Sequence, residues 1–131
     1  MNKEETIKEW LLLADGDLKT AEDELRMKEA VTNAICFHAQ QCVEKCLKAY
    51  LTSVNQPFGK THDIAELVEL AKKSDREFET LYKLKANKLT RYAVEVRYPD
   101  EFYIPSLDEA RESLEIARET RKFIVEKINK T

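Results

Sequence analysis

The sequence has few residues that break helices, with only 2 glycines and 3 prolines among its 131 residues. All-β and α/β domains need many turns, so this scarcity argues against both classes. Charged residues make up 36% of the chain and are spaced for helices. A chain of this length folds as one domain and buries roughly two-thirds of its unfolded surface. The sequence therefore predicts a single all-α domain over residues 1–131, an up-and-down bundle of four long helices plus one short helix.

Cysteine is also scarce, and its pattern suggests neither a disulfide nor a metal site. Cys36, Cys42 and Cys46 lie on one predicted helix, which holds them apart along its length. Cys42 and Cys46 have the spacing of a two-ligand metal clip, but no neighbouring His or Cys cluster completes a set of four ligands. We predict reduced thiols in the core, with no metal and no cofactor.

Long apolar runs are missing as well. No run approaches the ~20 residues of a membrane span, and the N-terminus does not resemble a signal peptide, so we expect a cytoplasmic protein. The net charge of −3 conceals acidic first thirty residues and a basic segment from Lys83 to Tyr98. This asymmetry argues against a general affinity for nucleic acid and favours a local anion-binding patch.

Apolar residues at helical spacing predict five helices. Their expected extents are about Lys3–Met27, Thr32–Val54, a third helix from Thr61, Arg76–Val96 and a fifth from Ser106. Thr32 or Asn33, Thr61 and Ser106 are the expected N-caps, and Pro99 is expected to end the fourth helix. Arg121 interrupts the apolar stripe of the fifth helix.

The second predicted helix has two different faces. Its apolar stripe is typical of a helix packed into a core. A polar row lies nearly opposite and consists of His38, Gln41, Lys45 and Lys48. This row is either a solvated surface or the lining of a groove. Phe37 projects toward the polar side and favours a covering partner, such as a second copy of the chain.

Four segments in order resemble the HEPN family of small helical bundles. They are an acidic first helix, the stretch Phe37–Tyr50 (FHAQQCVEKCLKAY), Thr61–Ile64 (THDI) and Arg97–Pro99 (RYP). The resemblance implies a homodimeric bundle, often encoded beside a minimal nucleotidyltransferase in a toxin–antitoxin-like pair. It also implies that the transferase can attach nucleotides to a tyrosine of its HEPN partner, and Tyr98 is the first position to consider.

Some members of the family are metal-independent ribonucleases, which carry an Arg followed four to six residues later by His. Here neither Arg91 nor Arg97 is followed by such a His, and His38 and His62 are the only histidines. RNA cleavage without metal needs a proton-transfer group with a pKa near 7, which Arg97 cannot supply. The sequence therefore leaves open whether the chain is an enzyme.

Each candidate residue also has a structural explanation. His62, at a predicted helix N-terminus, either donates to a loop carbonyl or helps to hold a phosphate. Arg97 either stabilises a helix end or forms a phosphate fork beside Lys88, Arg91 and Tyr98. We predict nucleotide or RNA binding in a basic groove near a dimer interface, by His38, Gln41, Lys45, Lys48, His62, Lys88, Arg91, Arg97 and Tyr98. An endoribonuclease and a scaffolding homodimer without a ligand are the alternatives.

Overall fold

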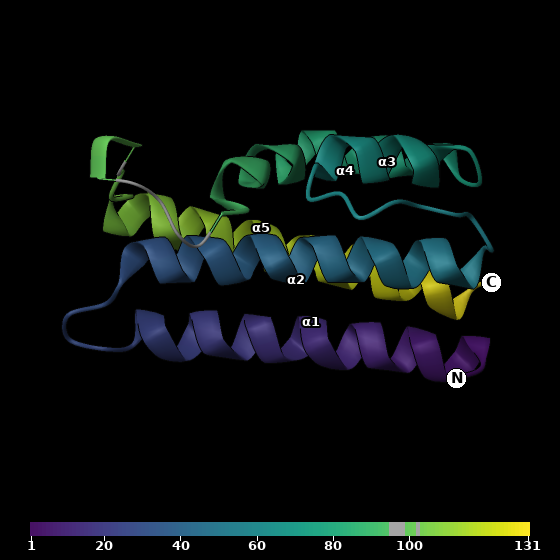
Figure 1. The fold of residues 1–131 in the computed structure, drawn as a ribbon, viewed down its shortest axis with the longest axis horizontal. Coiled ribbons are helices and arrows are strands. Elements are labelled where there is room, and N and C mark those ends of the chain that lie inside the picture. The colour runs from purple at the N-terminus through teal and green to yellow at the C-terminus, as the bar shows by residue number, and fades with distance from the viewer. Residues whose placement is uncertain (95–98, 102) are drawn as a thin grey trace.

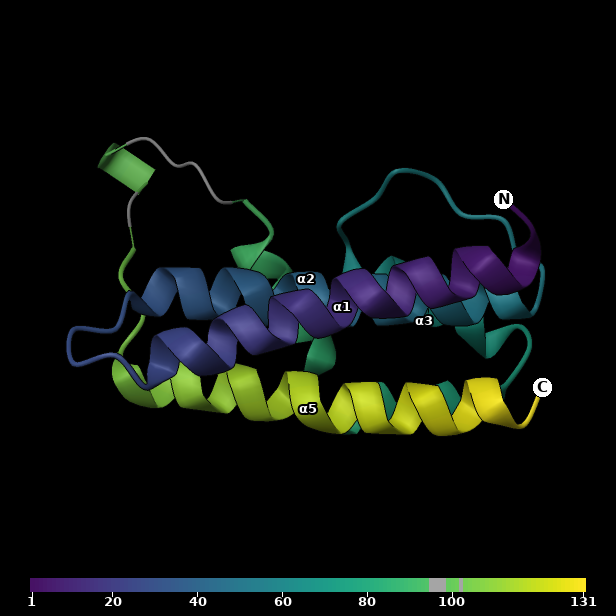
Figure 2. The same ribbon diagram turned by 90° about the horizontal axis from the view of Figure 1, so that it is seen from below.

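Three long helices form the body of the molecule. The computed structural model describes residues 1–94, 99–101 and 103–131. The long helices are α1 (Lys3–Leu25), α2 (Thr32–Ser53) and α5 (Leu107–Asn129). Figure 1 shows α1 and α2 side by side and antiparallel, and Figure 2 shows α5 running along the same bundle. All regular structure in these ranges is helical, which confirms the all-α prediction.

Shorter helical pieces cover the side of α2 that faces away from α1 (Figure 1). They are α3 (Ile64–Lys72), η1 (Arg76–Glu79), α4 (Thr80–Lys83) and η2 (Ala86–Tyr92), with the single turn η3 (Pro99–Glu101) farther along the chain. Within the described ranges, no helix combines the length and the apolar character needed to cross a membrane.

Helix α2 is the centre of the fold because α1, α3, α5 and η2 all pack against it. Its predicted apolar stripe is fully buried or nearly so, and consists of Ile35, Ala39, Cys42, Val43, Cys46, Leu47 and Tyr50. The three cysteines are buried and unpaired. The sequence pattern predicts that burial of these apolar side chains is the main source of stability.

The helix caps in the structure agree only in part with those predicted from the sequence. Ser106 caps α5 as predicted, since its Oγ accepts a hydrogen bond from the Glu109 backbone N–H at 3.0 Å. The N-cap of α3 is Asp63 and not Thr61, because the Asp63 carboxylate accepts from the Ala65 N–H at 3.0 Å. Helix α2 begins at Thr32 itself, and the hydroxyl of Thr32 donates to the Pro105 carbonyl at 2.7 Å instead of capping.

The predicted fourth helix over Arg76–Val96 is wrong as a continuous element. The chain breaks at Lys85, which has a left-handed φ of 66°. At 100° per residue, a straight helix would place Lys85 in the same stripe as Phe78, Leu81 and Leu89. The break costs about 1–2 kcal/mol for a residue with a Cβ, but it keeps the Lys85 side chain exposed and buries Ala86 instead.

The polar interruption of α5 has a partner in α1. Arg121 donates through Nε to Asp15 Oδ1 at 2.5 Å. One turn earlier in α5, the Arg118 Nη2 lies 2.8 Å from Glu22 Oε2. These two ion pairs lie along the contact between α1 and α5. Arg121 therefore interrupts the apolar stripe of α5 but binds α1.

We expect Phe78→Ala to lower the free energy of unfolding by about 3–5 kcal/mol, because it opens a cavity in the core. The Phe78 ring is fully buried in η1, with its centroid 4.2 Å from that of Tyr50 and 5.2 Å from that of Phe123. Urea unfolding measures the change. Phe78→Leu should cost less, and equal losses for the two variants would contradict a packing role.

Candidate functional site

The predicted site residues are separated into two groups in the structure. Arg97 and Tyr98 lie outside the described residues. The first group faces α1 and the connection before α3, and it consists of His38, Gln41, Lys45 and Lys48 of α2 together with His62. The second group, Lys88 and Arg91, belongs to η2 and faces α5. Of the predicted residues that the structure describes, the pocket between η2 and α5 is lined by Lys88 and Arg91 and by none of the first group.

The first polar contact on α2 is made with Asp17 of α1. His38 Nδ1 lies 2.8 Å from Asp17 Oδ1, and Lys45 Nζ lies 2.5 Å from Asp17 Oδ2. All three side chains are at most about a quarter exposed. The predicted polar row is therefore not a freely solvated surface at His38 and Lys45, but a set of contacts between α1 and α2.

A second polar cluster is centred on the Glu44 carboxylate. We call Gln40, Gln41, Glu44, Lys48 and His62 the Glu44 cluster. Glu44 Oε2 accepts from Lys48 Nζ at 2.8 Å, and Glu44 Oε1 accepts from His62 Nδ1 at 2.8 Å and from Gln40 Nε2 at 3.1 Å. Gln41 Nε2 donates to Gln40 Oε1 at 2.7 Å, which extends the network along α2.

The Glu44–Lys48 pair is buried, with side chains only 5% and 9% exposed. The Lys48 Nζ lies 5.6 Å from the Trp10 ring centroid and 5.9 Å from that of Phe58, so two aromatic rings cover the ammonium. Burial alone would raise the pKa of Glu44, but hydrogen bonds from Lys48, His62 and Gln40 outweigh it and hold the pKa below its ordinary value.

Both histidines have the same arrangement. Each uses Nδ1 to donate to a carboxylate, that of the half-buried Asp17 for His38 and that of the buried Glu44 for His62, so Nε2 is the ring nitrogen that remains for a proton or a ligand. The His62 side chain is 64% exposed, whereas that of His38 is 26% exposed. His62 is therefore the histidine that a substrate in solution reaches more easily.

The start of α3, where we predict a phosphate site beside His62, has few free donors. Two backbone N–H groups at the start of α3 already have partners, since Ile64 N donates to Thr90 Oγ1 and Ala65 N to Asp63 Oδ1, each at 3.0 Å. The carboxylates of Asp63 and Glu66 also lie in this first turn and repel an anion.

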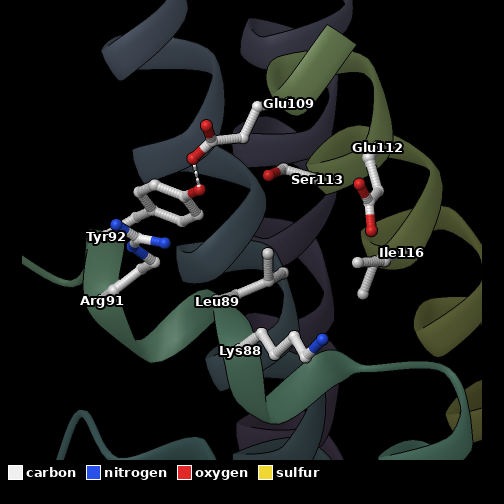
Figure 3. A pocket seen from close by; sticks show the side chains of 8 residues that line it. All are labelled: Lys88, Leu89, Arg91, Tyr92, Glu109, Glu112, Ser113 and Ile116. Carbon is white, nitrogen blue, oxygen red and sulfur yellow. Dashed lines mark hydrogen bonds between the residues drawn. The ribbon is translucent and has the colours of Figure 1, made fainter. Parts of the chain in front are cut away.

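A pocket lies between η2 and α5, and Figure 3 shows its side chains. We call it the η2–α5 pocket. Its volume is about 200 Å³, and it is lined by Lys88, Leu89, Arg91, Tyr92, Glu109, Glu112, Ser113 and Ile116. Apolar side chains from both elements form part of its wall, and charged groups of both signs surround them. The predicted basic groove is thus lined by acids as well on its α5 side.

Glu109 organises one end of this pocket. Tyr103 donates through its hydroxyl to Glu109 Oε1 at 2.5 Å, and the Tyr92 hydroxyl donates to Oε2 (Figure 3). Burial would raise the pKa of Glu109, but these hydrogen bonds outweigh it and lower the pKa. Burial and the Glu109 contact raise the pKa of Tyr92, so this phenol is a donor near neutral pH and not a base.

The Arg91 guanidinium is held by the same two tyrosines. Its central carbon lies 5.5 Å from the Tyr92 ring centroid and 5.0 Å from that of Tyr103. Behind Tyr92 and Ser113 lies the fully buried Cys36 thiol, whose pKa is raised by burial. A thiol in that state is a poor nucleophile, so Cys36 forms part of the core.

Several residues of these clusters were missed at the sequence level. Glu44 carried a usable signal, because a glutamate four residues before Lys48 is the favoured order for a helical ion pair. Glu109 also carried one, in the capping-box spacing after Ser106. Asp17 and Glu112 carried none, since their neighbours come from distant parts of the chain. Among the described residues no group of three His, Cys, Asp or Glu side chains could hold a metal ion.

We expect Glu44→Gln to lower the free energy of unfolding at pH 7 by about 3 kcal/mol, because it leaves the Lys48 ammonium buried without its carboxylate. The folded pKa of Glu44 is depressed, so its stabilisation is complete above the unfolded pKa of about 4.3 and is lost as the pH falls through the folded value. The difference in free energy of unfolding between wild type and variant should therefore be smaller at pH 3.

Chemical denaturation at pH 7 and pH 3 measures this gap. Glu119→Gln is the matched control, because Glu119 is exposed on α5 and makes no ion pair or hydrogen bond with another described side chain. A gap of equal size at both pH values would rule out the depressed Glu44 pKa as its source.

Comparison with known proteins identifies the family. A crystal structure of an archaeal HEPN homologue superposes with a TM-score of 0.70, is 22% identical and is aligned over 93% of this chain and 97% of the other. That likeness shows the fold alone. No curated protein matches the chain. The family model for the HEPN domain matches residues 7–128, nearly the whole chain, and the protein therefore belongs to the HEPN domain family.

Proposed function

We propose that this HEPN-domain protein binds a nucleotide or RNA in the η2–α5 pocket. The observation that carries the proposal is that Lys88 and Arg91 both line a cavity of about 200 Å³ whose wall includes the Tyr92 ring. Phosphate binding needs cations, and a base needs an aromatic or apolar surface. The pocket offers both within one turn of η2.

The state of Arg91 supports this role. Contacts with the Tyr92 and Tyr103 rings orient the guanidinium before any ligand arrives, which reduces the entropy lost on binding. Tyr103 is 48% exposed, so it also offers an aromatic surface to a base beside the phosphate contacts. Lys88 adds a flexible point charge from the same element.

We further propose a homodimer that works with a separately encoded minimal nucleotidyltransferase, in a toxin–antitoxin-like pair in the cytoplasm. Family membership supports the partnership, and three unpaired thiols agree with a reducing compartment. Tyr98 is the proposed acceptor of any nucleotide that the transferase attaches. Purification from the native cell, with the intact mass and sedimentation of whatever co-elutes, tests both partners. An unmodified monomer without companions would refute this part.

If the ligand-binding proposal is right, Lys88→Ala weakens the binding of RNA. We expect about a tenfold weaker affinity for a short single-stranded RNA, because one charge-assisted phosphate contact is lost, together with a smaller salt dependence. Fluorescence anisotropy at several salt concentrations measures both. Lys83→Ala is the matched control, since Lys83 is an exposed lysine of α4 outside the pocket. Equal losses in the two variants would contradict a site at Lys88.

One observation favours a metal-independent endoribonuclease as a second candidate. The His62 ring is fixed through Nδ1 by Glu44 and exposes the rest of the imidazole, which is the arrangement of an oriented general base. Under our preferred proposal, single-stranded RNA stays intact when incubated with the protein in a chelator. Cleavage that is lost in His62→Gln and retained in His38→Gln would establish the ribonuclease instead.

A further inference from the structure

We propose that the η2–α5 pocket recognises a ribonucleoside monophosphate unit through its sugar, with Glu112 accepting hydrogen bonds from the ribose hydroxyls. The inference rests on the proposed nucleotide-binding function and names the chemical class of the ligand. The unit is either a free nucleotide or the 3′ end of an RNA, because both carry two neighbouring hydroxyls close to one phosphate.

The two carboxylates of the pocket have different roles. Glu109 is occupied on both oxygens by the hydroxyls of Tyr92 and Tyr103. Glu112 lies one helical turn further along α5, is exposed, and makes no hydrogen bond or ion pair with another described side chain. It is therefore the carboxylate of the pocket that can accept new donors without breaking an existing contact.

Lys88 and Glu112 lie on opposite walls of the same cavity. Figure 3 shows Lys88 on η2 and Glu112 on α5, both beside the space bounded by Leu89 and Ile116. No ion pair joins them. A ligand that fills this space meets a cation on one side, a carboxylate on the other and apolar side chains between them.

A purely anionic ligand does not explain this arrangement, because a second or third phosphate would lie near Glu112 and be repelled. A carboxylate has no protons to donate and accepts up to two hydrogen bonds side by side, which matches the neighbouring 2′ and 3′ hydroxyls of a ribose. The 2′-hydroxyl is also the group by which a protein distinguishes RNA from DNA. With the phosphate at Lys88, the sugar is the part that reaches Glu112.

The test compares AMP with 2′-deoxy-AMP by calorimetry on the full chain. We expect the wild type to bind AMP about tenfold more tightly, as expected for a hydrogen bond to a charged group. In Glu112→Ala this preference should fall to about one, because AMP loses the bonds of both hydroxyls and 2′-deoxy-AMP loses only that of its 3′-hydroxyl. Ala is a good helix former, so the exposed substitution should leave α5 folded. Glu119→Ala, on the same helix and outside the pocket, should keep the preference.

The outcomes distinguish failure of the sugar inference from failure of the proposed function. If the wild type binds both nucleotides equally, or Glu112→Ala keeps the preference, the sugar inference is wrong and the proposed function stands. If neither nucleotide nor RNA binds, the proposed function itself fails and the inference falls with it. Short RNAs with a 3′ diol and with a 3′-deoxy end then distinguish the two sources. If the ligand is an RNA terminus, removal of its 3′-hydroxyl weakens binding and the free nucleotide does not bind.

Discussion

The fold depends on one constraint, which is that α2 is surrounded by other elements on most of its circumference. An amphipathic helix at the edge of a bundle can turn its polar side to water, but α2 cannot. Each polar side chain that it buries in these contacts therefore needs a partner within the protein. Asp17 supplies this partner for His38 and Lys45, and Glu44 supplies it for Lys48, Gln40 and His62.

The Glu44 cluster has the additional effect of fixing a connection that lacks secondary structure of its own. The chain between α2 and α3 runs back along α2 before α3 begins (Figure 1). Phe58 packs on Lys48 and His62 binds Glu44, so this connection is held at two points to the helix beneath it. A buried ion pair adds little net stability compared with apolar residues, but it specifies one arrangement of the groups around it. The position of α3 depends on that arrangement.

Sequence patterns predicted the features that depend on residue spacing within one helix. They did not predict contacts between side chains from distant segments of the chain. The apolar stripe of α2 and the Ser106 cap are local features, and both are present in the structure. The break at Lys85 could have been foreseen, because a lysine inside an apolar stripe conflicts with a straight helix. The pairing of Asp17 with His38 could not, since 21 residues separate them and only the packing of α1 on α2 brings them together. The acidic wall of the η2–α5 pocket was missed for the same reason.

Trp10 is the only tryptophan of the chain, and its indole lies against the Lys48 ammonium and edge-on to Phe58, with ring centroids 6.3 Å apart. Its fluorescence therefore comes from one place, the point where α1, α2 and the following connection meet. If that connection lifts away while the long helices stay packed, the indole gains water and loses its neighbours before the helical circular dichroism changes. The molecule thus has a built-in optical probe that distinguishes local opening around Glu44 from global unfolding.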